Sequence, residues 1–82
     1  LASAPEARAR TEAAEALGKD GSRAAVEALA RAVREDAFWG TQAACAAALA
    51  NVRSPAARDA LLAALDVPHP KARRAVVAAL SA

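Results

Sequence analysis

The sequence predicts an all-α fold, an α-solenoid in which short helical hairpins stack side by side, with about two and a half repeats and five helices. Three observations support this prediction. Hydrophobic residues make up 56% of the 82 residues, and most of them are alanine, the best helix former. The chain repeats itself at an offset of 31 to 32 residues. Serine, proline and glycine stand where that repeat expects helices to begin and end.

The internal repeat covers both halves of the predicted hairpin. One set of three segments aligns without gaps: Arg10–Gly18, Gln42–Ala50 and Arg73–Ser81. A second pair aligns at the same offset: Ser22–Val33 and Ser54–Leu65. Agreement of both halves at one offset indicates a true structural repeat. A stack of such hairpins buries each apolar face against its neighbours.

The sequence marks a beginning or an end for most of the predicted helices. In chain order we expect helices over residues 4–17, 23–35, 37–51, 55–66 and 70–81. Ser22 and Ser54 stand at N-cap positions, and Pro55 follows at the first helical position, where its missing N–H costs nothing. Gly18 is expected to close the first helix, and Asp36 to cap the third.

These helices are expected to form one domain over residues 1–82. The first repeat is placed at about 4–35, the second at about 37–66, and the first helix of a third at about 70–81. On the second helix, four charged residues of alternating sign are spaced by four and predict a solvent face: Arg23, Glu27, Arg31 and Glu35. The sequence begins at Leu1, so we expect a piece of a longer chain, whose uncapped solenoid ends could self-associate.

Composition excludes several classes of function. The net charge of +2, from 11 basic and 9 acidic residues, is too balanced to favour nucleic-acid binding. The longest apolar run, Ala43–Ala50, has eight residues, far fewer than the ~20 that cross a membrane. A single cysteine allows no internal disulfide and favours a reducing compartment, so the expected location is cytoplasmic.

The sequence offers no catalytic, cofactor or metal site. His69 is the only histidine, and it precedes Pro70 at a helix start, where capping is a simpler role than metal ligation without further ligands. Cys45 aligns with Ala13 and Val76 in a core position, which predicts a buried, inert thiol; a nucleophile would need a histidine placed beside it. We therefore expect no cofactor in this chain.

Two neighbouring aromatic residues are the first candidates for an interface or for packing between domains. Phe38 and Trp39, the only phenylalanine and the only tryptophan, align with the start of the leading helix in each repeat, which lies at the rim of the stack. Gly40 follows them and would let another element approach closely. We favour packing here, within the stack or against a neighbouring domain, over a ligand platform.

A basic cluster near the end of the chain supplies the other candidates, Lys71, Arg73 and Arg74. No acidic residue follows Asp66, so these charges are available for an electrostatic contact. Arg73 also aligns with Arg10 and Gln42, a position where a long polar side chain would tie neighbouring repeats together.

The pattern of a long polar residue, then "AAxALG", a short turn and "SPxARxALxxAL" resembles HEAT repeats of the short type. More specifically, "DAFWGTQAACAAALANVRSPAARDALLAAL" followed by "HPKARRAVVAAL" is similar to the HEAT-like C-terminal region of bacterial zinc aminopeptidases of the aminopeptidase N (gluzincin) family. This second resemblance depends mainly on Phe38-Trp39-Gly40 and His69-Pro70-Lys71. It implies a non-catalytic scaffold that packs against the catalytic region of a parent peptidase.

The chemistry of that family lies outside this chain. The sequence has no H-E-x-x-H motif to hold zinc and supply a base, no GAMEN-like segment and no tyrosine, so zinc is expected only in the parent. The alternative is a free-standing HEAT scaffold that binds another protein, including the lyase-type HEAT proteins. A peptidase tail should expose an apolar end, whereas a complete scaffold should have polar helices at both ends. Leu1, Ala2 and the terminal "AVVAALSA" favour the first.

Overall fold

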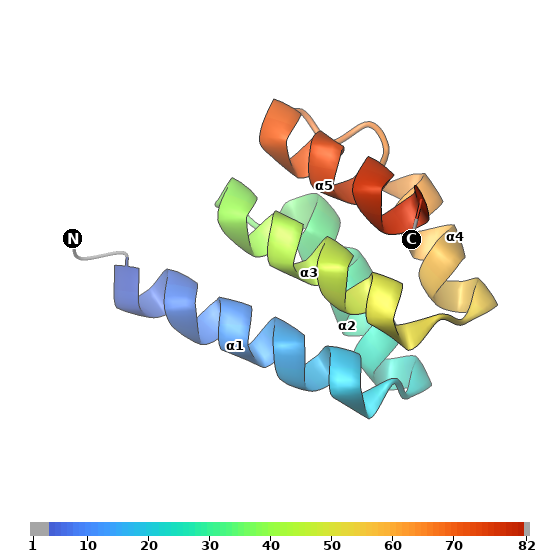
Figure 1. The fold of residues 1–82 in the computed structure, drawn as a ribbon. Helices are drawn as coiled ribbons and strands as arrows, with labels where there is room; N and C mark the ends of the chain where they lie inside the picture. The colour runs from blue at the N-terminus through green and yellow to red at the C-terminus, as the bar shows by residue number, and fades with distance from the viewer. Residues whose placement is uncertain (1–3, 82) are drawn as a thin grey trace.

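A computed structural model describes residues 4–81 of the chain, with side chains from residue 8 onward. Within this range every regular element is an α-helix (Figure 1). The helices are α1 (Ala4–Asp20), α2 (Arg23–Glu35), α3 (Trp39–Val52), α4 (Pro55–Ala63) and α5 (Pro70–Ser81). The prediction of an all-α solenoid with five helices is confirmed. The expectations for Leu1 and Ala2 fall outside the described residues.

The helices form two layers. Helices α1, α3 and α5 run parallel in one layer, and α2 and α4 lie behind them (Figure 1). Helix α3 is central and contacts the other four. It carries no charged residue, as expected for a helix buried on several sides. The largest buried apolar side chains come from three helices, α2, α3 and α5, and form one continuous core: Leu29, Val33, Leu49 and Val76. No helix in the described range combines the length and hydropathy needed to cross a membrane.

The predicted N-caps of α2 and α4 are confirmed. The hydroxyl of Ser22 accepts a hydrogen bond from Ala25 N at 3.2 Å, and that of Ser54 accepts one from Ala57 N at 3.1 Å. Pro55 is the first residue of α4. Each bond satisfies one of the free N–H groups at a helix start. The four charged residues spaced along α2 are exposed, as predicted.

The prediction that Gly18 closes the first helix is wrong. Helix α1 continues to Asp20, and it is Gly21 that adopts the left-handed conformation, with φ of +67° and its N–H donating to Leu17 O at 3.0 Å. Gly18 is buried within the helix, where an added Cβ would lie 2.9 Å from the Cβ of Ala48. This glycine therefore serves the close approach of α1 to α3, which local sequence signals did not distinguish from a helix end.

Asp36 does not cap α3 as predicted, because α3 begins at Trp39 and not at residue 37. The Oδ1 atom of Asp36 instead accepts a hydrogen bond from Phe38 N at 2.9 Å, which forms a turn between α2 and α3. Its Oδ2 atom lies 2.9 Å from Arg10 Nε. Asp36 thus fixes the turn and ties it to α1.

Helix α4 is shorter than predicted. It ends at Ala63, and residues 64–66 form a turn in place of the last helical residues. Ala64 N donates to Leu61 O, and Val67 N donates to Ala64 O; both bonds span three residues, the spacing of a tightened 3₁₀-type turn. Val67, which follows this turn, is 3% exposed and belongs to the core.

Candidate functional site

The N-terminal ends of α3 and α5 lie at the same rim of the stack, and four side chains meet there. We call Phe38, Trp39, His69 and Lys71 the rim cluster. The rings of Phe38 and Trp39 are 5.8 Å apart and tilted by 51°. The His69 ring stacks on Trp39 at 5.4 Å and 22°. Lys71 Nζ lies 4.8 Å from the centre of the Trp39 ring, within the range of a cation–π contact.

Local backbone contacts hold the rim cluster in place. His69 Nδ1 accepts a hydrogen bond from Lys71 N at 3.1 Å, so its predicted role as a helix cap is confirmed. A Cβ on Gly40 would lie 2.6 Å from Phe38 Cε2, which shows that the Phe38 ring covers this glycine. Gly40 does allow a close approach, but by the preceding ring and not by a neighbouring element.

The two aromatic residues differ in burial. Trp39 is partly buried and packs against the core, and its stacking on His69 joins the second repeat to the third. Phe38 is 42% exposed. Trp39 therefore contributes to packing within the stack, whereas much of Phe38 remains available for contact with another molecule.

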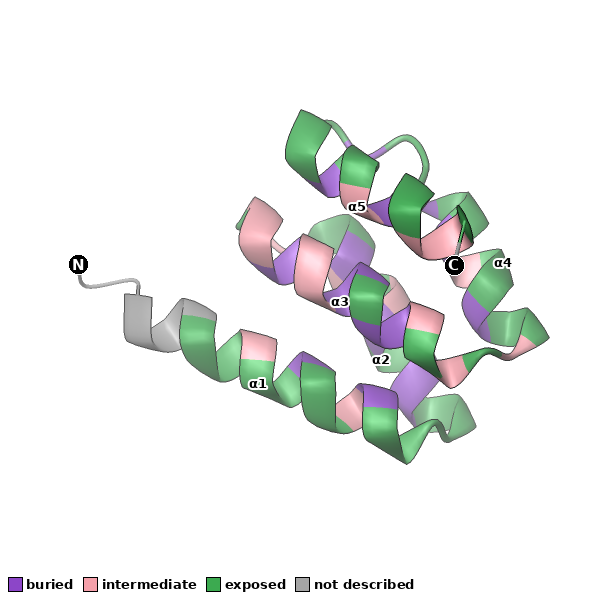
Figure 2. Ribbon diagram, in the orientation of Figure 1, coloured by how far each residue is buried: buried purple, intermediate pink, exposed green. Residues whose placement is uncertain are grey.

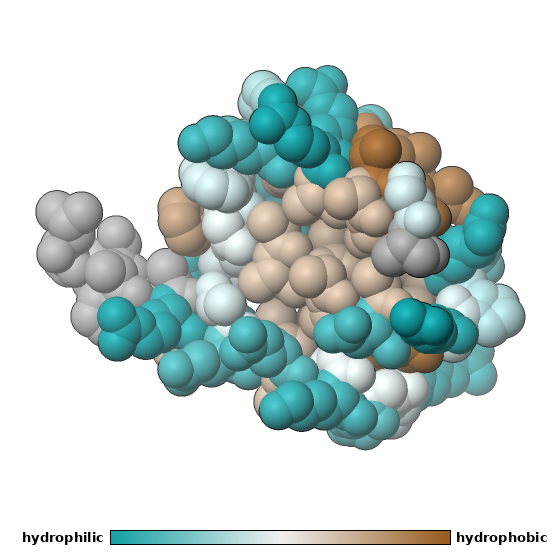
Figure 3. All heavy atoms as spheres, viewed as in Figure 1, coloured by the Kyte–Doolittle hydropathy of each residue, from teal (hydrophilic) through white to brown (hydrophobic). Residues whose placement is uncertain are grey.

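The three predicted basic residues Lys71, Arg73 and Arg74 are all exposed on α5. Neither of the two ion pairs among the described side chains includes any of them. Figure 3 shows hydrophilic residues over the first half of this helix, at the top of the view. Lys71 is the one whose charged group contacts the rim cluster.

The sequence predicts that a long polar side chain ties neighbouring repeats together at the position shared by Arg10, Gln42 and Arg73. The three residues differ in what they do there. Arg10 does join α1 to the turn after α2, through its ion pair with Asp36. Gln42 is 6% exposed and lies inside the stack. Arg73 is exposed and takes no part in the ion pairs of the described side chains.

Cys45 is buried, as predicted, with 2% of its surface exposed. Burial, together with a smaller effect of the negative charge of Asp36, raises the pKa of its thiol to about 11. A small cavity of about 170 Å³ beside it is lined by α1, α2 and α3. It includes Thr41, whose Oγ1 has no hydrogen-bond partner within the described range. A protonated, enclosed thiol is a poor nucleophile, and the described residues contain no cluster of three metal-binding side chains.

Both ends of the stack carry many exposed residues (Figure 2), but these residues differ in kind. From residue 8 onward, the exposed residues of α1 are all charged or small: Arg8, Ala9, Arg10, Glu12, Ala13, Glu15, Ala16, Lys19 and Asp20. The other end exposes large apolar side chains: Leu62 at 47%, Leu65 at 40% and Val77 at 50%. Figure 3 shows strongly hydrophobic residues at the upper right, over α4 and the end of α5.

The repeat explains this apolar surface, which we call the open end and define by Leu62, Leu65 and Val77. Val77 aligns with Ala46, which is 0% exposed, and Leu65 aligns with Val33, which is also 0% exposed. The same positions are therefore covered in earlier repeats and uncovered in the last described one. Such a difference is expected wherever no further repeat packs against these positions.

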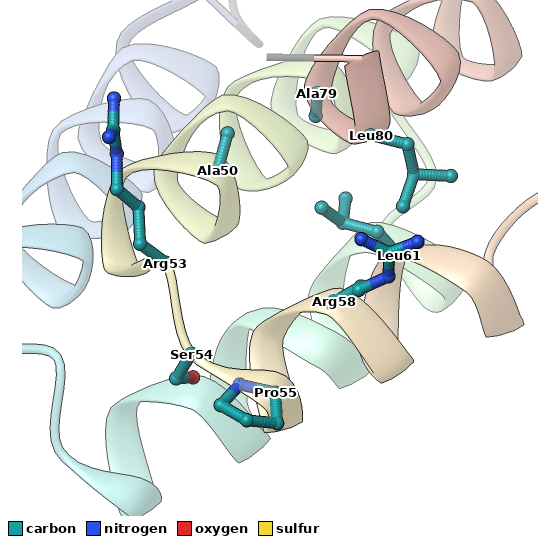
Figure 4. Close-up of a pocket in the computed structure, with 8 residues that line it drawn as sticks. All are labelled: Ala50, Arg53, Ser54, Pro55, Arg58, Leu61, Ala79 and Leu80. Carbon is teal, nitrogen blue, oxygen red and sulfur yellow. The ribbon is translucent and has the colours of Figure 1, made fainter.

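A groove of about 400 Å³ adjoins the open end, between the end of α3, the start of α4 and the end of α5 (Figure 4). Its lining residues are Ala50, Arg53, Ser54, Pro55, Arg58, Leu61, Ala79 and Leu80. At the equivalent place in the first repeat, Gly18 packs against Ala48 and Val26 is 6% exposed. In the second repeat Ala50 and Arg58 occupy these two positions, and both line the groove.

Sequence reasoning did not single out two parts of this surface. The stacking of His69 on Trp39 was missed, although the alignment placed the starts of the two helices at the same rim. The sequence analysis also did not name the residues of the open end. The signal was present in the alignment, where Val77 matches Ala46 and Leu65 matches Val33, which puts large apolar side chains at these positions of the last described repeat.

Comparisons with known proteins give one match. A family model described as HEAT repeats matches residues 1–81, almost the whole chain. No curated protein and no solved structure matches it.

Proposed function

Because the chain belongs to the HEAT-repeat family, we propose that it is a non-catalytic helical scaffold whose role is to hold other protein segments. The buried, protonated thiol of Cys45 and the capping role of His69 support a structural function for the two residues with the most reactive side chains. The match to the family model supports a repeat scaffold.

The observation that carries this proposal is the open end. Leu62, Leu65 and Val77 are 40–50% exposed, and solenoid repeats bury such positions against the next repeat. Exposed apolar side chains gathered at one place indicate a surface that contacts protein. The adjoining groove of about 400 Å³ lies where a further helix would run beside α4. We propose that the occupant is an amphipathic helix with the apolar pattern of α2 and α4.

As the specific setting, we propose the C-terminal helical scaffold of a bacterial zinc aminopeptidase. The likeness of Phe38-Trp39-Gly40 and His69-Pro70-Lys71 supports it, and the open end would pack against a neighbouring part of that parent. Zinc and the catalytic groups would belong to the parent. The coding sequence that precedes Leu1 tests this setting. An H-E-x-x-H motif with a downstream glutamate supports it, and a start codon directly before Leu1 contradicts it.

The outer surface of α1 favours a second candidate, a free-standing HEAT scaffold for a protein partner, including the lyase-type HEAT proteins. From residue 8 onward this helix exposes only charged and small side chains. A terminal repeat needs such a polar outer face for solubility. In this candidate the solenoid begins with α1 and binds its partner beyond α5.

Sedimentation equilibrium tests the scaffold proposal on the isolated chain. We expect concentration-dependent self-association through the open end, and we expect the double variant Leu62→Glu/Val77→Glu to be monomeric, because each carboxylate would have to be desolvated in the contact. The matched control, Ala9→Glu/Ala16→Glu on the outer surface of α1, adds the same charge and should associate as the original chain does. Equal loss of association in both variants, or no association in the original chain, would contradict the proposal.

A further inference from the structure

The rim cluster presents aromatic surface beside positive charge. Phe38 is 42% exposed next to the ring of Trp39, and Lys71 Nζ lies over that ring at 4.8 Å. Arg73 and Arg74 follow on the same helix, both exposed. Among the side chains of residues 8–81, no carboxylate forms an ion pair with any of these three cations. The cluster therefore offers both an apolar contact and unneutralised charge.

The rim cluster is also held in shape before any partner arrives. The carboxylate of Asp36 fixes the backbone of Phe38 through its 2.9 Å hydrogen bond, and Arg10 holds that carboxylate from α1. On the other side, the His69 ring both caps α5 and stacks on Trp39. A surface that is already ordered loses little entropy on binding, which favours affinity.

The surrounding electrostatics favour a negatively charged partner. Helices α3 and α5 both begin at this rim, and their N-terminal ends carry partial positive charge. Neither helix has an acidic residue in its first turn, and α5 has three basic residues and no acidic one. The nearby Asp36 is already paired with Arg10. The C-terminal ends of α2 and α4, with Glu35 and Asp66, lead into the same rim, so the positive charge is concentrated at the start of α5, on Lys71, Arg73 and Arg74.

We infer that the rim cluster binds an acidic segment of a partner protein, with a carboxylate on the Lys71 ammonium and an apolar side chain of the same segment on the Phe38 ring. An ammonium has three N–H donors, so Lys71 can contact the Trp39 ring and still donate to a carboxylate. This inference rests on the proposed scaffold function but uses a different surface from the open end, and it gives the chemistry of a partner.

The charge balance favours protein over nucleic acid as the source of the negative charge. Nucleic-acid binding draws most of its affinity from many phosphate contacts along a basic surface. Here three cations are clustered on one helix, and the chain has 11 basic and 9 acidic residues. An exposed Phe38 could also stack on a base, so the experiment includes a nucleic-acid probe.

The test uses Trp39 as its reporter, since it is the only tryptophan in the chain. The probe is a short synthetic peptide with glutamates on both sides of a single phenylalanine. We expect a saturable change in Trp39 fluorescence as this peptide is added, and no saturable change with a peptide in which glutamines replace the glutamates. Phe38→Ala and Lys71→Glu should each weaken binding by at least about tenfold, the effect of losing one good contact.

Matched controls separate this site from general charge attraction. Arg31→Glu, on the exposed face of α2, makes the same change in net charge as Lys71→Glu and should leave binding unchanged. Leu62→Glu/Val77→Glu should also bind the peptide normally. Loss of self-association through the open end can therefore be distinguished from loss of peptide binding at the rim cluster. Thermal unfolding of each variant checks that it is folded, and Lys71→Gln provides a second, milder variant.

Three results would overturn the inference. The first is the absence of a saturable signal with the acidic peptide. The second is an equal loss of binding in Arg31→Glu and Lys71→Glu, which would show non-specific attraction. The third is tighter binding of single-stranded oligothymidylate than of the peptide, with the same dependence on Phe38 and Lys71, which would make the rim a nucleic-acid surface.

Discussion

Gly18 shows most directly how a single residue sets the spacing of the stack. An added Cβ would meet the Cβ of Ala48 at 2.9 Å and its backbone oxygen at 3.2 Å. Backbone cannot move aside without shifting α1 from α3, and overpacking of this kind costs about 1–3 kcal/mol. The usual gain from replacing glycine by alanine in a helix is up to about 1 kcal/mol, so the two effects oppose each other at this position.

We predict that Gly18→Ala lowers the free energy of unfolding by about 1–2 kcal/mol. Gly40→Ala is the matched control, because its Cβ would meet the far edge of the exposed Phe38 ring, which can move at little cost. Gly40→Ala should be neutral or slightly stabilising. Urea denaturation of both variants measures the difference. A stabilising effect at both positions would show that α1 and α3 are not in close contact at Gly18.

Cys45 gives a prediction for stability against pH. Burial, together with the negative charge of Asp36, raises the pKa of its thiol from 9.0 to about 11 in the folded chain. Between these values the unfolded thiol loses its proton while the folded one keeps it, so rising pH favours unfolding. The stabilising contribution is complete below pH 9.0 and is lost as pH rises toward about 11, with a slope of at most about 1.4 kcal/mol per pH unit.

The comparison is with the variant Cys45→Ala, because alanine occupies the equivalent position in the first repeat. We predict that the free energy of unfolding of the original chain falls relative to this variant between pH 9 and pH 11. The native thiol should also react with a disulfide reagent at neutral pH only as fast as the chain opens. A parallel pH dependence in the two proteins, or a native reaction as fast as that of the denatured chain, would contradict a buried thiol.

At the scale of the helices, the turn between α2 and α3 depends on Asp36, which is bonded to the turn backbone and to Arg10. Its side chain is only 11% exposed, so removing both bonds in Asp36→Ala should lower the free energy of unfolding by about 2 kcal/mol. Asp36→Asn keeps an oxygen for Phe38 N and loses the ion pair, so it should cost about half as much. Chemical denaturation measures both.

Arg10 provides the control for this prediction. Arg10→Ala in the original chain should cost up to about 1 kcal/mol, since the Arg10 side chain is 42% exposed and solvent screens such pairs. In the Asp36→Asn background the same change should cost close to nothing. If Arg10→Ala has the same cost in both backgrounds, the ion pair does not link α1 to the turn.

Local sequence signals predicted the helices better than their ends. The serines that cap α2 and α4 were identified because the capping bond involves only the next few residues. The end of α1 was misplaced because a glycine in contact with another helix has the same local appearance as a glycine that closes one. The start of α3 was misplaced because Asp36 bonds within a turn, which competes with capping.

The rim cluster was only partly predictable. The alignment made Phe38 equivalent to His69 and Trp39 equivalent to Pro70, at the starts of their helices, and charge identified Lys71. The stacking of His69 on Trp39 depends on the rotation of α5 about its axis relative to α3, which is decided by packing in the core between them. That packing involves residues far apart in sequence, such as Leu49 and Val76, and no local pattern reports it.

At the scale of the whole molecule, the difference between its two ends is the main functional feature. From residue 8, α1 has a polar outer surface, whereas α4 and α5 expose Leu62, Leu65 and Val77. In a solenoid each repeat is stabilised mainly by its neighbours, and stability is close to a sum of repeat and interface contributions. A surface that receives a further helix should therefore gain stability when that helix is supplied.

The most direct test of this account supplies the missing partner as part of the chain. A copy of residues 52–66, appended after Ala82, keeps the offset of 31 residues and places a helix like α4 beside α4 and α5. We predict a single unfolding transition at a higher temperature than that of the original chain, and no increase when the host carries Leu62→Glu/Val77→Glu. An unchanged unfolding temperature, or an equal increase in both hosts, would contradict an open end that receives a further helix.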